Sequence, residues 1–130
     1  MSKTYFRKAT TLAASLAISA FAVATHAEPS NKWRIELDHS AQTDGAIVLR
    51  ISPVGGTPIE VETKIPAKTS ENRAASLLSA SLKTTLGKGY HVEVDDGEDV
   101  LIKRQGDTPN FELTLVSSSV TGLTVELERE

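Results

Sequence analysis

The chain has 130 residues, carries 14 basic against 17 acidic side chains, and contains no cysteine. Three of the basic residues and none of the acidic ones fall in the first 27 positions, so the remaining 103 residues (130 minus 27) have a formal charge of 11 minus 17, or −6. Nucleic acid is excluded as an expected partner, because such binding depends on Lys and Arg displacing counterions. Disulfides are excluded too, so a packed core must stabilise the fold.

The first 27 residues have the pattern of a cleavable secretory signal. A basic start precedes an apolar stretch at 12–24, which is followed by the small residues Thr25 and Ala27. This stretch is shorter than the roughly 20 residues that a membrane-spanning helix needs. We expect cleavage after Ala27, with a cut that uses Ala22 and Ala24 as the alternative. The product should be periplasmic or secreted and should have no membrane anchor.

Residues 28–32 are polar, and we predict that they form a flexible lead-in to a single domain at 33–130. Three segments then alternate apolar with polar residues, and this period of two predicts half-buried strands. Their apolar positions are Trp33, Ile35 and Leu37, then Ile47, Leu49 and Ile51, then Ile59, Val61 and Ile65. Asp44-Gly45 and Gly55-Gly56 separate the segments, and both pairs are typical of hairpin turns.

The apolar spacing changes to three and four residues at 70–86, which predicts one helix with a single buried stripe. The stripe consists of Ala74, Leu77, Leu78, Leu82 and Leu86. Thr69 or Ser70 can cap its first turn, and Glu71 suits the positive end of the helix dipole. Gly87 or Gly89 is expected to end it.

Four more segments with a period of two follow the helix. Their apolar positions are Tyr90, Val92 and Val94, then Val100 and Ile102, then Phe111, Leu113 and Leu115, then Leu123, Val125 and Leu127. The predicted order is therefore three strands, a helix and four strands, and most connections are too short for parallel crossovers. We predict an α+β fold: one antiparallel, strongly curled sheet of about seven strands with the helix packed on its apolar face.

One helix, about 10 Å across, cannot cover an open sheet of seven strands spaced about 4.8 Å apart. Strong curling, or a division into two layers, would let the strands cover one another in a monomer, which we favour. The alternative is a surplus apolar face in the last hairpin, covered by a second copy or an apolar ligand. The residues of that face would be Leu113, Leu115, Val125 and Leu127.

The densest acidic cluster surrounds Gly97 and consists of Asp95, Asp96, Glu98 and Asp99. A loop with an odd number of residues, 96–98, keeps the apolar faces of its two strands together, with Val94 opposite Val100. Asp95 and Asp99 then become cross-strand neighbours, whose repulsion a cation would relieve. They are weak candidates for a metal site. Nearly consecutive ligands splay apart, so a solvated hairpin tip is the interpretation that we favour.

The histidines beyond the predicted cleavage site, His39 and His91, are not expected to share a site. His39 continues the inward phase of the first strand, whereas His91 is out of phase with its neighbours. We expect the aromatic residues Trp33, Tyr90 and Phe111 to lie in the core, because all three occupy inward positions.

We identify no catalytic or cofactor-binding residue and expect no cofactor. The sequence therefore favours a non-catalytic exported protein with a binding, inhibitory or structural role, whose partner is an unknown protein or small ligand. The alternative is a small periplasmic hydrolase that uses the acidic hairpin tip and a histidine. Such an enzyme would need these groups in a pocket that excludes water.

Overall fold

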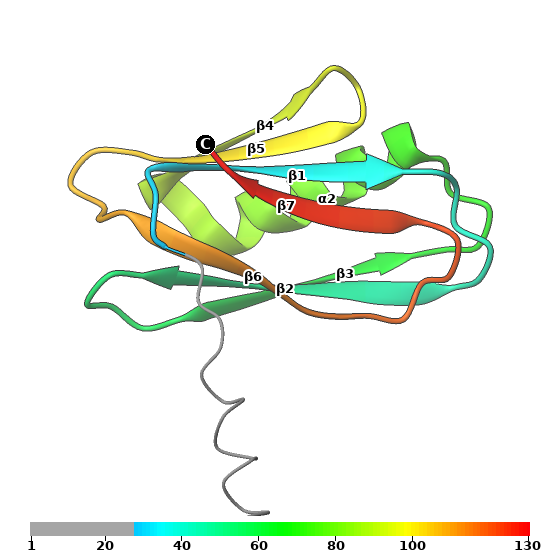
Figure 1. The fold of residues 1–130 in the computed structure, drawn as a ribbon, viewed down its shortest axis with the longest axis horizontal. Coiled ribbons are helices and arrows are strands. Elements are labelled where there is room, and N and C mark those ends of the chain that lie inside the picture. Colours follow the sequence, from blue (N-terminus) through cyan, green and yellow to red (C-terminus); the bar gives the residue numbers. More distant parts are fainter. Residues whose placement is uncertain (1–27) are drawn as a thin grey trace, which may run out of the picture.

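The computed structural model describes residues 28–130, so the predicted signal peptide at 1–27 lies outside the described residues. Within this range, seven strands form two antiparallel sheets, and one α-helix packs against both of them (Figure 1). The predicted α+β class and the antiparallel pairing are confirmed. None of the described helices has the length and apolarity needed to cross a bilayer.

The two sheets divide the strands without following chain order. The four-stranded sheet has the order β4-β5-β1-β7 and consists of β1 (Lys32–Asp38), β4 (Tyr90–Asp95), β5 (Asp99–Arg104) and β7 (Thr124–Arg129). The three-stranded sheet has the order β3-β2-β6 and consists of β2 (Gly45–Pro53), β3 (Ile59–Ile65) and β6 (Phe111–Ser118). Edge strands of the two sheets are thus β4, β7, β3 and β6.

The predicted single, strongly curled sheet is wrong, and so is the strand order that it implied. The chain leaves β1 at Asp38 and enters β2 in the other sheet, so Asp44-Gly45 does not form a hairpin turn. A period of two identifies the buried face of a strand but not its neighbours, and two layers bury these faces against each other equally well. The division into two layers, which the sequence also allowed, matches the structure.

The helix α2 (Glu71–Leu86) has the predicted start and end. Ser70 Oγ accepts the Arg73 N–H at 3.1 Å, and the helix ends at Gly87, whose φ is 68°. A short 3-10 turn, η2 (Gly87–Gly89), leads into β4. The predicted stripe faces the core, with Leu77 only partly buried. Because α2 contacts β3 and β4, it closes one side between the two sheets.

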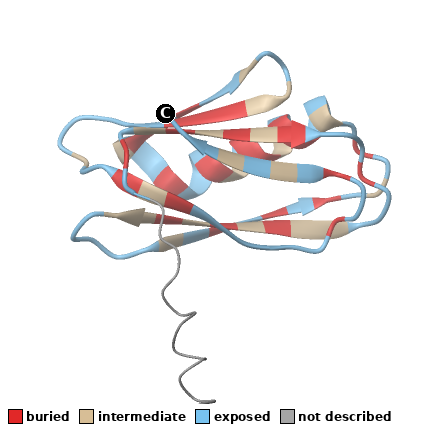
Figure 2. Ribbon diagram, viewed as in Figure 1, coloured by how far each residue is buried: buried red, intermediate tan, exposed pale blue. Residues whose placement is uncertain are grey.

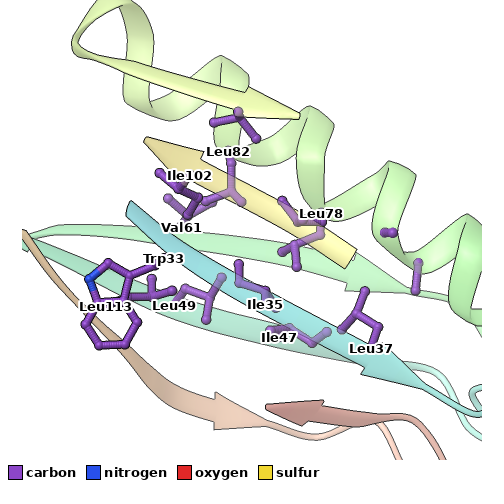
Figure 3. Packing of buried hydrophobic residues seen from close by; sticks show 14 of the residues in the cluster. Trp33, Ile35, Leu37, Ile47, Leu49, Val61, Leu78, Leu82, Ile102 and Leu113 are labelled. Atoms are coloured by element: carbon purple, nitrogen blue, oxygen red, sulfur yellow. The ribbon is translucent and has the colours of Figure 1, made fainter. Parts of the chain in front are cut away.

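One core fills the space between the sheets and the helix (Figure 2). Figure 3 shows the inward side chains of β1 facing those of the three-stranded sheet, with Leu78 and Leu82 of α2 beside them. As predicted, the aromatic residues lie in this core. Trp33 Nε1 donates to the Phe111 carbonyl at 2.8 Å, and the rings of Tyr90 and Phe111 meet edge to face with centroids 5.2 Å apart. Phe111 therefore joins the two layers.

The predicted flexible lead-in at 28–32 is held to the domain at Ser30. The Ser30 N–H and carbonyl exchange two hydrogen bonds of 2.9 Å with Phe111, and Ser30 Oγ donates to the Glu130 carbonyl at 3.0 Å. Lys32 already belongs to β1. Ser30 therefore links the start of β6 to the end of β7.

Candidate functional site

A row of four acidic residues crosses the outer face of the four-stranded sheet. Asp95 on β4 lies opposite Asp99 on β5. Glu36 on β1 lies between Asp99 on one side and Glu126 of β7 on the other. Glu36, Asp99 and Glu126 alternate with buried or partly buried neighbours, and Asp95 lies directly opposite Asp99, so the pleat directs all four away from the core. Like charges placed directly opposite each other destabilise a sheet, so this acidic row opposes folding unless cations offset it.

The hairpin tip has the predicted odd loop. Val94 lies opposite Val100, and Asp95 lies opposite Asp99. Asp96 and Gly97 have φ values of 52° and 80°, which close the loop between the two strands. The two weak metal candidates are therefore cross-strand neighbours, as the sequence predicted.

The positive charge between Asp95 and Asp99 is the guanidinium of Arg34. Its Nη1 donates to Asp99 Oδ2 at 2.7 Å and to Asp95 Oδ2 at 3.1 Å, while Nε donates to Glu130 Oε2 at 2.9 Å. These three bonds raise the pKa of Arg34, and the bond to Glu130 has the largest effect. The bond between Arg34 and Glu130 also lowers the pKa of Glu130. Among residues 28–130, no three His, Cys, Asp or Glu side chains gather in a way that could hold a metal ion.

We expect Arg34→Met to lower the free energy of unfolding by about 2 kcal/mol at neutral pH. Three carboxylates would lose a charged donor, and the repulsion between Asp95 and Asp99 would be unopposed. Urea denaturation measures this loss. Arg50→Met is the matched control, because Arg50 forms an exposed pair with Glu60 and should cost less than about 0.5 kcal/mol. Equal losses in both variants would contradict a structural role for the Arg34 network.

At the β7 end of the acidic row, no cation of residues 28–130 bridges the carboxylates in this way. Within the described part of the chain, no Lys, Arg or His nitrogen lies within 4.0 Å of the carboxylates of Glu36, Glu126 or Glu128. The pKa of Glu36 is raised, first by the negative charge of Glu128 and to a smaller extent by desolvation, Asp99 and Glu126. Arg34, which lies opposite Glu128 in the register, opposes this rise only in part, so among the described residues negative charge is incompletely offset beside the edge of this sheet.

A small pocket of about 120 Å³ lies beside the same part of the sheet. Its acidic lining residues are Glu36, Asp38, Glu98, Asp99 and Glu126. The pKa of Glu98 is raised, chiefly by the charge of Glu71 at the start of α2. Repulsion from neighbouring carboxylates makes Glu36 and Glu98 easier to protonate, and an added cation would reduce that repulsion.

Neither histidine lines this pocket. The inward position expected for His39 is wrong: β1 ends at Asp38, and a φ of 66° at His39 leaves its side chain exposed. This turn also brings His39 Nε2 to 3.8 Å from Asp38 Oδ2, a contact that strand alternation would prevent. His91 lies near the start of β4, beside Glu93 at 3.6 Å. The two histidines do not share a site.

Sequence reasoning found the two aspartates of the hairpin tip but missed the rest of this surface. Arg34, Glu36 and Glu126 were visible as outward positions of the first and last strands. Their meeting depends on β1 lying between β5 and β7, which the sequence pattern does not contain.

The sequence matches no protein-family model and no curated protein. Its function is therefore inferred from the chemistry of the site.

Proposed function

We propose that this chain is an exported, non-catalytic binding domain that uses the acidic outer face of its four-stranded sheet to bind a basic partner protein. The observation that supports this most strongly is the acidic row, Asp95, Asp99, Glu36 and Glu126, in register across all four strands. A positively charged surface would relieve the repulsion within the row on binding. Relief of this repulsion adds to the direct attraction between the two surfaces. That attraction also speeds association at low ionic strength.

The shape of the row favours a protein over a single cation. Four strands at a spacing of about 4.8 Å spread the carboxylates over about 14 Å, so they do not converge on one ion. Arg34 already bridges the aspartates at one end. Several basic side chains on one partner surface would match the remaining charges, whereas a nucleic acid would be repelled by them.

One observation favours the hydrolase alternative. Glu36 and Glu98 both line the pocket and both have raised pKa values, and a carboxyl group with a raised pKa can act as a general acid. Against it, the pocket is small, about 120 Å³, and neither His39 nor His91 lines it. Hydrolysis of a generic ester, glycoside, phosphate or peptide substrate that is lost in Glu36→Gln would replace the binding proposal.

The binding proposal is tested with the mature protein, expected to begin at Glu28, and a fluorescent poly-lysine peptide of about 20 residues. At low salt the double variant Glu36→Gln, Glu126→Gln should weaken binding about tenfold, and the affinity of the unchanged protein should fall as salt is added. Fluorescence anisotropy measures both effects.

The matched control is Glu60→Gln, Glu62→Gln, which removes the same charge from the outward side of β3 in the other sheet. We expect it to change affinity less than about twofold, since only the distant field of the protein is altered. Equal weakening by the two double variants would show that net charge, not the acidic row, drives binding, and would overturn the proposal.

A further inference from the structure

Among the residues that the structure describes, the backbone hydrogen-bonding groups at the outer edge of β7 have no partner strand. β7 pairs with β1 on one side only, and the Glu130 N–H donates to the Lys32 carbonyl at 3.0 Å. Bonded pairs alternate along an antiparallel ladder, so the even-numbered residues of β7 bond to β1. The N–H and carbonyl groups of Val125 and Leu127 therefore point to the open edge, where no strand within residues 28–130 pairs with them.

Apolar side chains beside this edge are incompletely covered. Val125 and Leu127 are only partly buried against the core, and Leu115 on the adjacent β6 is 37% exposed. Leu113, by contrast, is 1% exposed, so the surplus apolar face predicted in this region does not include it. An added strand would bury the inward side chains of the β7 edge further.

Charge decides what kind of strand fits. The outward residues of β7 include Glu126, which ends the acidic row, and Glu128 beside it, and neither carboxylate forms an ion pair within residues 28–130. A second copy that paired through its own β7 would bring the same glutamates together, which is unfavourable. A strand that alternates basic with apolar residues would place its basic side chains beside these glutamates and its apolar ones beside Val125 and Leu127.

The opposite edge of the sheet, β4, is less suitable. The charge of Asp95 at that end of the row is already bonded to Arg34, and α2 packs against β4. We infer that the partner docks by adding an extended segment of alternating basic and apolar residues to the free edge of β7. This inference rests on the proposed function and specifies how the acidic face would engage its partner.

The test uses a labelled peptide of about ten residues in which Lys and Val alternate, and a second peptide with the same residues in two blocks. The alternating peptide should bind the mature protein about tenfold more tightly than the block peptide, because only alternation matches both faces of the edge. Hydrogen exchange at the Val125 and Leu127 amides should slow with the alternating peptide alone. Unchanged exchange at both amides would overturn the inference.

Val125→Pro removes one donor of the free edge, and proline is tolerated where a strand N–H faces solvent. Val94→Pro is its matched control at the β4 edge. The Gln105 N–H donates to the Gly89 carbonyl, so the odd-numbered residues of β4 bond to β5. The N–H of Val94, an even-numbered residue, therefore points to the open edge of β4. Val125→Pro should weaken the alternating peptide about tenfold, and Val94→Pro less than about twofold. Equal effects would contradict docking at β7, and if Val125→Pro does not fold, exchange in the unmodified protein still decides.

Poly-lysine binding separates the two proposals. It should persist in Val125→Pro and weaken in Glu36→Gln, Glu126→Gln. If poly-lysine binds through the acidic row while the β7 amides stay unprotected by the alternating peptide, the edge inference fails and the proposed function stands. If the β7 amides are protected but the glutamate variants bind normally, the acidic face is not the recognition surface and the proposed function fails.

Discussion

Phe111→Ala should lower the free energy of unfolding by about 4 kcal/mol, the largest loss that we expect from a single truncation. The Phe111 side chain is fully buried at 0% exposure and packs edge to face with Tyr90 of the other sheet. Its removal leaves a cavity between the layers and a ring contact without a partner. The hydrogen bonds of Trp33 and Ser30 to Phe111 are made by the Phe111 backbone, so alanine retains them. The loss of stability therefore reports the contribution of the Phe111 ring.

Equilibrium urea denaturation measures this effect, with Val54→Ala as the control. Val54 is 54% exposed in the turn between β2 and β3, so its truncation should change stability by less than about 0.5 kcal/mol. A loss below about 1.5 kcal/mol for Phe111→Ala would mean that the two layers are not held together through this side chain.

Gly122→Ala should lower the free energy of unfolding by about 3 kcal/mol. Gly122 has a φ of 90°, and a Cβ built on it would lie 2.6 Å from the Ser40 carbonyl oxygen. The left-handed backbone disfavours alanine, and the close approach forces two connections apart. One is the loop between β6 and β7, and the other is the connection between β1 and β2, so the position of the β7 edge should shift as well.

Gly55→Ala is the control that separates these two causes. Gly55 also has a positive φ, 76°, but nothing lies within 4 Å of the position that a Cβ would take there. Alanine at this site should cost only the conformational strain of about 1 kcal/mol. Thermal unfolding of both variants gives the comparison, and equal losses would show that the loop at Gly122 has room to move away from Ser40.

Much of the local structure could be predicted from the sequence, because its causes lie within a few residues. The helix stripe, the Ser70 cap and the end at Gly87 follow from spacing and capping chemistry. The odd loop at 96–98 follows from a requirement that Val94 and Val100 share a face. His39 shows the limit of this reasoning, since a period of two cannot tell where a strand ends and the chain turns outward.

The structural roles of Gly45 and Arg34 depend on contacts with residues that are distant in the sequence. Asp44-Gly45 looks like a turn, but Gly45 is the first residue of β2, and a Cβ there would lie 2.7 Å from the backbone of Ser119. Close approach of a distant segment, not a hairpin, makes glycine suitable at this position. Arg34 is an ordinary outward residue of a strand until β4 and β5 bring Asp95 and Asp99 beside it.

The sequence by itself determined most of the residues that form the core, where the helix lies and how the hairpin at 96–98 is registered, because these depend on periodicity and on neighbours close in the chain. Only the tertiary structure decided that β1 pairs with β5 and β7, with partners about 60 to 100 residues away. Every strand has an apolar face, so hydrophobic burial alone does not choose among pairings. The acidic row and the free β7 edge exist only because that choice places Asp99, Glu36 and Glu126 side by side.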